Sequence, residues 1–186
     1  MITYPATSIG LIELSSITAG YQAADVMLKS ANVNLMLSRT ICSGKYMVLI
    51  SGEVAAVKTA VENACAEVKF FLIDHFVIPN VDPSVLRGIS GQSTATFLDA
   101  LGICESFNIA ALIEAADQAV KSASVDLIEL RLAMALGGKA FFSVTGDVSS
   151  VKTAVETGAA VLTEKGALVN KLVIAQPRPE LMRDMI

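Results

Sequence analysis

The sequence predicts an α/β fold of the α+β, ferredoxin-like kind, built from two tandem copies of one small module. Two observations lead to this prediction. A set of short motifs from the first half of the chain returns in the second half in the same order. Each half also shows the same succession of strand-like and helix-like segments, β-α-β-β-α-β. We place the first module at residues 5–82, a linker at 83–97 and the second module at 98–186.

The internal repeat is visible in the motifs themselves. Gly10-Leu11-Ile12-Glu13 returns as Gly102-Ile103-Cys104-Glu105, Ala23-Ala24-Asp25 as Ala115-Ala116-Asp117, Lys29-Ser30-Ala31 as Lys121-Ser122-Ala123, and Gly52-Glu53-Val54 as Gly146-Asp147-Val148. The run Val57-Lys58-Thr59-Ala60-Val61-Glu62 returns as Val151-Lys152-Thr153-Ala154-Val155-Glu156. A short insertion in the second copy separates these blocks, so the copies differ most near 40–45 and 133–139.

Each module begins with a short strand that ends at a polar break, followed by a helix in which Ala, Leu, Met and Lys recur at helical spacing. Two strands joined by a short turn come next. A second helix then starts, with acidic residues expected in its first turn, where they suit the helix dipole. A last strand precedes a proline-rich exit. The strands are expected at 8–14, 33–40, 46–51 and 72–78, and again at 101–106, 126–134, 140–145 and 168–174; the first helices are expected at 18–31 and 109–123.

The composition narrows the classes of function. Hydrophobic residues make up 53% of the chain and charged residues only 17%, which predicts extensive burial in cores and interfaces. A net charge of −4 without a basic stripe argues against nucleic acid as a partner. Apolar runs are too short to cross a membrane, and Met1–Gly10 lacks a secretory pattern, so we expect a cytoplasmic protein. Three cysteines without a CxxC motif predict reduced thiols.

Few side chains are suited to catalysis, and we expect no enzymatic activity. The repeated Glu13 and Glu105 could suggest a carboxylate pair for acid/base work, but a structural role at the strand-to-helix junction is favoured. His75 is the single histidine and lies in an apolar strand, which favours a packing or surface role over a ligand. Gly137-Gly138 followed by lysine lacks the spacing of a phosphate-binding loop, so a tight turn is preferred.

The three cysteines differ in context. Cys65 lies between two alanines on a helix, and Cys104 replaces the Ile12 of the other copy, so both are interpreted as core residues. Cys42 lies in a turn beside Ser43-Gly44, where packing is a poor explanation for a thiol. The corresponding region of the second copy, near Gly137-Gly138, has no cysteine.

These repeated motifs resemble those of the bacterial microcompartment domain family over nearly the whole chain. The family pattern contains G-x-x-E, A-A-D followed by K-S-A, a hairpin reading I-G-S-G, G-D-V-x-x-V and a closing V-I-P. The hairpin pattern is met here by Ile41-Cys42-Ser43-Gly44, and the closing one by Val77-Ile78-Pro79. In particular, the chain resembles the tandem-domain members of the family that carry an iron–sulfur cluster, because of its Thr40-Ile41-Cys42 run.

The resemblance implies a structural shell protein: a homotrimer whose six modules form a pseudohexagonal tile, together with other shell proteins. Lys29 and Lys121 match the family's tile-edge lysine, with an ordinary solvated lysine as the alternative. The arginine that usually follows V-I-P is replaced by Asn80 in the first copy, and Arg178 is the candidate in the second. Asp25 and Asp117 precede the two lysines by one helical turn, at the spacing of a weak surface ion pair.

The resemblance also implies a central pore, lined by Ile41, Cys42, Ser43 and Gly44 of the first copy and by Gly137 and Gly138 of the second. Three Cys42 thiols would meet on the threefold axis and hold one [4Fe–4S] cluster, for electron transfer or cluster delivery to enclosed redox enzymes. Zinc bound by three thiolates fits the same symmetry and stays open as an alternative. Two other functions also stay open: a plain tile with a metabolite pore, and a small enzyme or ligand-binding regulator.

Overall fold

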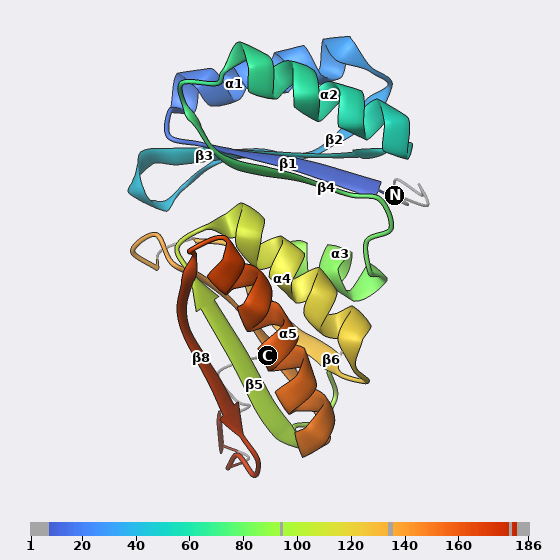
Figure 1. The fold of residues 1–186 in the computed structure, drawn as a ribbon, viewed down its shortest axis with the longest axis vertical. Helices are drawn as coiled ribbons and strands as arrows, with labels where there is room; N and C mark the ends of the chain where they lie inside the picture. The colour runs from blue at the N-terminus through green and yellow to red at the C-terminus, as the bar shows by residue number, and fades with distance from the viewer. Residues whose placement is uncertain (1–7, 94, 134–135, 179, 182–186) are drawn as a thin grey trace. The chain divides into compact units, whose positions relative to one another are not determined.

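The computed structural model describes residues 8–93, 95–133, 136–178 and 180–181 and divides into two compact units, residues 1–81 and 82–186 (Figure 1). Residues 5–7 of the expected first module and residues 182–186 of the expected second module lie outside the described residues. Met134, the expected end of a strand, lies outside them as well. Within the described part, no helix is long and apolar enough to cross a membrane.

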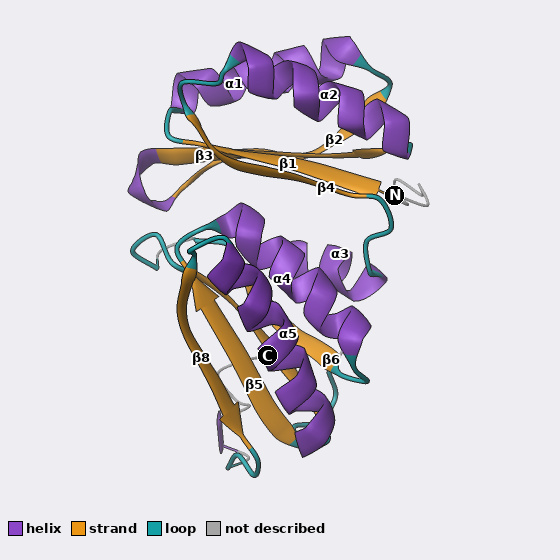
Figure 2. Ribbon diagram, viewed as in Figure 1, coloured by secondary structure: helices purple, strands orange, loops and turns teal. Residues whose placement is uncertain are grey.

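The first unit has the predicted β-α-β-β-α-β order. Its elements are β1 (Ser8–Leu14), α1 (Ile17–Ser30), β2 (Val33–Ile41), the short 3₁₀ turn Cys42–Gly44, β3 (Lys45–Gly52), α2 (Val54–Glu67) and β4 (Leu72–Ile78). The strands form one antiparallel sheet in the order β2-β3-β1-β4. Both helices lie on one face of this sheet (Figure 2).

The second unit repeats this arrangement. It contains β5 (Ala100–Ser106), α4 (Ile109–Ser122), β6 (Asp126–Arg131), β7 (Ala140–Gly146), α5 (Val148–Glu164) and β8 (Leu168–Ile174), with the sheet order β6-β7-β5-β8. The shared topology confirms the tandem ferredoxin-like prediction. Strand β6 ends at Arg131, short of the expected end at 134.

The segment expected as a linker, 83–97, contains a helix that the sequence analysis did not predict. This helix, α3 (Pro83–Ile89), packs against β6 and α4 and belongs to the second unit. Its start is well defined, since Asp82 caps it by accepting from the Ser84 backbone N–H and Pro83 occupies its first turn. Further along the linker, Ala95 packs with Leu101 and Ile128 in a small apolar cluster.

The acidic residues at the second helices lie at a different position from the one predicted. Glu53 and Asp147 are the N-cap residues of α2 and α5, and neither helix has an acidic residue in its first turn. The Asp147 carboxylate accepts hydrogen bonds from the backbone N–H groups and the hydroxyls of Ser149 and Ser150. Glu53 makes no such side-chain cap.

The core of the first unit lies between the sheet and its two helices. Small residues such as glycine allow the helices to pack close to the sheet. It consists of Ile12, Tyr46, Val48 and Ile50 from the sheet with Ala23, Met27, Val57, Ala60 and Val61 from the helices, among others. A Cβ atom on Gly10 would lie 2.6 Å from Val61 and 2.7 Å from Val57. Gly102 stands in the same relation to Val155 and Val151, which explains the glycine of the G-x-x-E motif.

The two cores share their plan but distribute volume differently. In the first unit, Gly20 of α1 lies directly against the Tyr46 ring, so that a Cβ atom there would fall 2.2 Å from the ring. The equivalent positions in the second unit hold Leu112 and Ala140, both fully buried. The helix position is small and the strand position large in the first unit, and the sizes are reversed in the second unit.

Candidate functional site

The turn between β2 and β3 begins with Cys42 and reverses the chain tightly. Ser43 and Gly44 both adopt positive φ angles, 65° and 72°, so two successive left-handed residues turn the chain. Such a conformation is costly for serine, while glycine adopts it freely. Ile41 is buried before the turn, and Cys42 is half-buried. The reversal therefore starts from a buried residue and places the thiol within the turn itself.

An ion pair lies at the base of this hairpin. The Lys45 ammonium, on the first residue after the turn, donates to Glu13 Oε1 of β1 over 2.8 Å. Because the Glu13 side chain is fully buried, this pairing fixes the start of β3 against the end of β1. Glu13 thus has the structural surroundings that the sequence analysis favoured, and Lys45 is a residue that it missed.

The hairpin of the second unit has the same base and a different turn. Lys139 donates to Glu105 Oε1 over 2.8 Å, as Lys45 does to Glu13. Gly137 and Gly138 have φ angles of 61° and 91°, and the Lys139 N–H donates to the Leu136 carbonyl, forming a tight turn. In both copies a glutamate ends the first strand and a lysine directly follows the turn. This double recurrence was the sequence signal for the two ion pairs.

Of the other two thiols, Cys104 is buried and Cys65 is partly buried against the core of the first unit. Burial, with the nearby Glu62, raises the pKa of Cys65 to about 11. Burial raises the pKa of Cys104 to about 12, although Lys171 acts in the opposite direction. The Cys104 thiol also donates to the Val155 carbonyl. Both therefore stay protonated at neutral pH, in keeping with their interpretation as core residues.

Within the described part of one chain, Cys42 is not accompanied by a set of metal ligands. Among the described residues of a single chain, no group of three or more His, Cys, Asp or Glu side chains could hold a metal ion. A thiolate is nevertheless the ligand type that iron–sulfur clusters and structural zinc both accept. The donor at Cys42 fits either group, provided that further copies supply the remaining thiolates. His75 is exposed on β4 and lies outside this turn.

The two candidate edge lysines lie in unequal surroundings. Lys29 is exposed and pairs with the exposed Asp25 over 2.7 Å, as the helical spacing predicted. Lys121 pairs with Asp117 over 2.5 Å, but the Asp117 carboxylate is buried and also accepts from the Asp82 backbone N–H over 2.8 Å. The prediction of a surface pair was therefore wrong for the second copy, where the Asp117 carboxylate is buried and contacts the backbone at the start of α3. Arg178 is exposed near Glu180.

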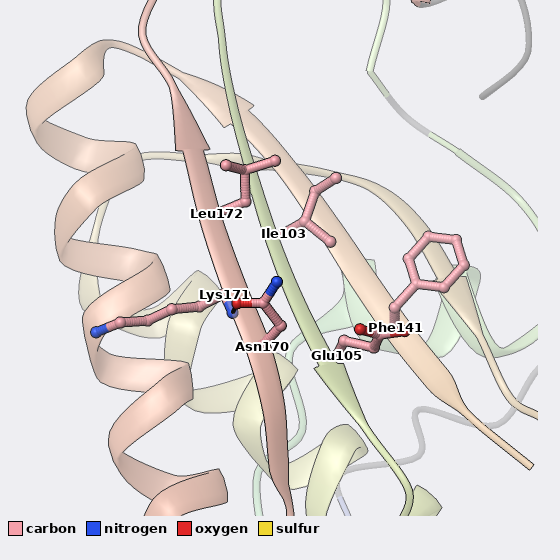
Figure 3. Close-up of a pocket in the computed structure, with 6 residues that line it drawn as sticks. All are labelled: Ile103, Glu105, Phe141, Asn170, Lys171 and Leu172. Carbon is pink, nitrogen blue, oxygen red and sulfur yellow. Dashed lines mark hydrogen bonds between the residues drawn. The ribbon is translucent and has the colours of Figure 1, made fainter.

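A shallow hollow of about 310 Å³ lies on the face of the second sheet that carries no helix (Figure 3). Ile103, Glu105, Phe141, Asn170 and Leu172 point into it, whereas the Lys171 side chain extends to the opposite side of the sheet and pairs with Glu156 of α5. Its lining is mostly apolar.

Comparison with known proteins gives consistent results. A model of the BMC domain matches residues 8–81 and 100–177. The bacterial microcompartment shell protein PduT of Citrobacter freundii is 43% identical over 179 residues, which cover 96% of this chain and 97% of that protein. The crystal structure of a microcompartment protein from Desulfitobacterium hafniense DCB superposes with a TM-score of 0.84 at 48% identity, covering 95% of this chain and 98% of that one. The carboxysome assembly protein CcmO of Synechococcus elongatus is 32% identical over 189 residues, 95% of this chain and 68% of that protein.

Proposed function

The chain belongs to the bacterial microcompartment (BMC) domain family, and on that premise we propose that it is a structural protein of a microcompartment shell. The PduT relative is a shell protein by name and matches nearly the whole chain. The few candidate catalytic groups are engaged in structural pairs, such as Glu13 with Lys45 and Glu105 with Lys139. We expect the chain to act with other shell proteins and without catalysis of its own.

We further propose that three chains form a closed trimer in which six modules mimic a hexagonal tile. Homo-oligomers favour closed rotational symmetry, and two tandem modules per chain make three chains the natural number for a six-part ring. The apolar composition supports association. Exposed apolar side chains such as Ile17, Tyr21 and Leu172 are available for such contacts.

The observation that carries the finer proposal is the difference between the two hairpin turns. One turn holds a cysteine at a strained reversal, and the other holds Gly137-Gly138. Three symmetry-related Cys42 thiolates would hold one [4Fe–4S] cluster, with a water, a small ligand or a partner protein on the fourth iron. The chain's own contribution is to fix each thiol in place through the buried Ile41 and the Lys45–Glu13 pair.

Such a cluster supplies reversible one-electron chemistry, which suits transfer of electrons across the shell; an open iron site suits delivery of the cluster to enclosed redox enzymes. Zinc held by the same three thiolates is the competing metal centre. A plain tile, with Cys42 only lining a metabolite pore, is the competing function. These three possibilities differ in metal content.

Anaerobic reconstitution with iron and sulfide tests the proposal, with both elements counted per trimer. We expect about four of each per three chains in the parent, Cys65→Ser and Cys104→Ser proteins, and loss of both in Cys42→Ser. Retention in Cys42→Ser, or zinc as the sole metal of protein purified without oxygen, overturns the cluster. A stable monomer by light scattering overturns the trimer. A colourless trimer that forms sheets supports the plain tile.

A further inference from the structure

An arginine recurs near the end of the strand that leads into each hairpin turn. Arg39 lies on β2 opposite Met47 of β3, and Arg131 is the last residue of β6, opposite Phe141 of β7. The two arginines occupy equivalent positions of the repeat. Because their backbone settings match, a difference in the charges around them is a difference between the two copies.

The two guanidinium groups differ in their counter-ions. Arg131 Nη1 lies 3.3 Å from Glu129 Oε1, two residues earlier on the same face of β6. The first copy has Leu37 at the position of Glu129. Within the described part of the chain, Arg39 forms no ion pair with a carboxylate, and its Nε is buried without a hydrogen-bond partner. A buried polar group in this state costs free energy, which points to a partner that the described chain does not supply.

The unpaired arginine is the one that precedes the cysteine. Arg39 stands three residues before Cys42, where the turn begins, and three residues of an extended strand span about 10 Å. Lys45, on the other side of the turn, is already paired with the buried Glu13 over 2.8 Å. Among the described cations of this hairpin, Arg39 is therefore the one whose charge no carboxylate balances.

We propose that Arg39 raises the reduction potential of the cluster proposed at Cys42 by stabilising its reduced form. The second copy has neither feature, since Arg131 is paired and Gly137-Gly138 take the place of the cysteine turn. This inference rests on the proposed iron–sulfur function.

The physical basis is the change of charge on reduction. The cluster core accepts one electron from an external one-electron donor, and no bond to a thiolate breaks. The core with its three thiolates then passes from one net negative charge to two, and a nearby positive charge favours the more negative form. Salt screens exposed charges over about 10 Å at 0.1 M ionic strength and screens buried ones less, so the half-buried Arg39 can act over this distance.

Anaerobic redox titration of the reconstituted trimer tests the proposal, with dithionite as the reductant and the absorbance of the cluster as the readout. In Arg39→Met we expect the iron and sulfide content of the parent and a midpoint potential shifted to more negative values. Arg39→Lys keeps the charge and should stay close to the parent. The matched control is the double variant Glu129→Leu/Arg131→Met, which removes both charges of the neutralised pair and should leave the potential unchanged.

Leu37→Glu gives a second test that leaves Arg39 in place. It supplies in the first copy the carboxylate that Glu129 supplies in the second, so the potential should shift in the same direction as in Arg39→Met. Should Arg39→Met fail to fold, Leu37→Glu decides. The parent's potential in Leu37→Glu and in any folded Arg39→Met, at full iron and sulfide content, overturns the inference and leaves the cluster standing.

Two further outcomes also count against the proposal. A shift in the double variant as large as that in Arg39→Met overturns it, because the effect would then not depend on the unpaired charge. Absence of iron and sulfide from the reconstituted parent contradicts the iron–sulfur function and this inference together.

Discussion

The Lys45 ammonium lies 2.8 Å from Glu13 Oε1, and the Glu13 side chain has no exposure to solvent. The equivalent pair in the second unit, Lys139 and Glu105, has the same distance but remains partly exposed. One ionic arrangement therefore occurs twice in the chain in two degrees of burial. Because desolvation makes an unpaired charge costly, the two pairs should respond differently when the lysine is removed.

We expect Lys45→Met to destabilise the protein by about 3 kcal/mol, since it removes the ion-pair partner of a fully buried carboxylate. At this chain length that lowers the thermal midpoint by about 6–12 °C. The matched variant Lys139→Met should cost about 1 kcal/mol, because its partner keeps contact with water. Calorimetry at equal protein concentration compares them, and equal losses would show that burial does not distinguish the pairs.

Lys29→Asp should leave the trimer intact and impair its assembly into sheets seen by electron microscopy, if Lys29 meets a neighbouring tile. Lys58→Asp is the control, because Lys58 also forms an exposed pair one helical turn from Glu62. Lys121→Asp should in addition lower stability, since it sets a second carboxylate beside the buried Asp117. Normal sheets from Lys29→Asp would remove that residue from the tile edge.

Alkylation at pH 8 should label Cys42 well before the other two thiols in apo-protein. The pKa values of about 11 and about 12 for Cys65 and Cys104 leave about one thiol in a thousand or fewer ionised at that pH. Peptide mass spectrometry after timed iodoacetamide treatment measures the order. Native Cys42→Ser should react slowly, and unfolded parent should react at all three sites; fast labelling of Cys65 or Cys104 contradicts the prediction.

Asp147→Ala should destabilise α5 in a pH-dependent way. Hydrogen bonds from the Ser149 and Ser150 side chains hold the pKa of Asp147 well below its ordinary value of 3.8. The stabilisation is thus fully present above about pH 4 and is lost as the pH falls toward the depressed pKa. We expect the parent and the variant to differ in thermal midpoint at pH 7 and to converge below pH 4. Glu53→Ala is the control, because the Glu53 side chain makes no capping hydrogen bond to α2. The difference in thermal midpoint between this variant and the parent should not shrink in the same way as the pH falls.

Gly20→Leu and Tyr46→Ala should each destabilise the first unit, the former by overlap and the latter by a cavity, at costs on the order of 2–4 kcal/mol. The double variant should recover much of the loss, because it recreates the Leu112 and Ala140 arrangement of the second unit. Chemical denaturation of the four proteins gives the coupling energy. Additive losses would mean that the two positions do not compensate.

The sequence was sufficient to predict the β-α-β-β-α-β order of each module and the ferredoxin-like fold class, because the same pattern appears in both copies. Helix α3 was missed although Asp82-Pro83 is a helix start signal, since Ser and Gly nearby suggested a linker. Once α3 is overlooked, the contact between the buried Asp117 carboxylate and the backbone N–H of Asp82, which caps α3, cannot be foreseen.

The candidate site was predictable only in its local part. A turn containing Cys42 follows from the neighbouring Ser43-Gly44, whereas the Lys45–Glu13 pair joins residues far apart in sequence through the register of β1 and β3. The register of β1 against β3 is not set by a connecting turn, because α1 and β2 lie between the two strands; it depends on cross-strand packing, which one sequence does not display.

The first unit pairs a small Gly20 with a large Tyr46, and the second unit has a large Leu112 and a small Ala140 at the same positions. This difference also affects what recombination within the gene would produce. Two similar stretches within one gene invite recombination, which would fuse the start of one module to the end of the other. A crossover between the first helix and the third strand would join Gly20 to Ala140, leaving a hole, or Leu112 to Tyr46, forcing an overlap. We expect either hybrid to be less stable than the parent modules, which would disfavour the loss of one copy by recombination.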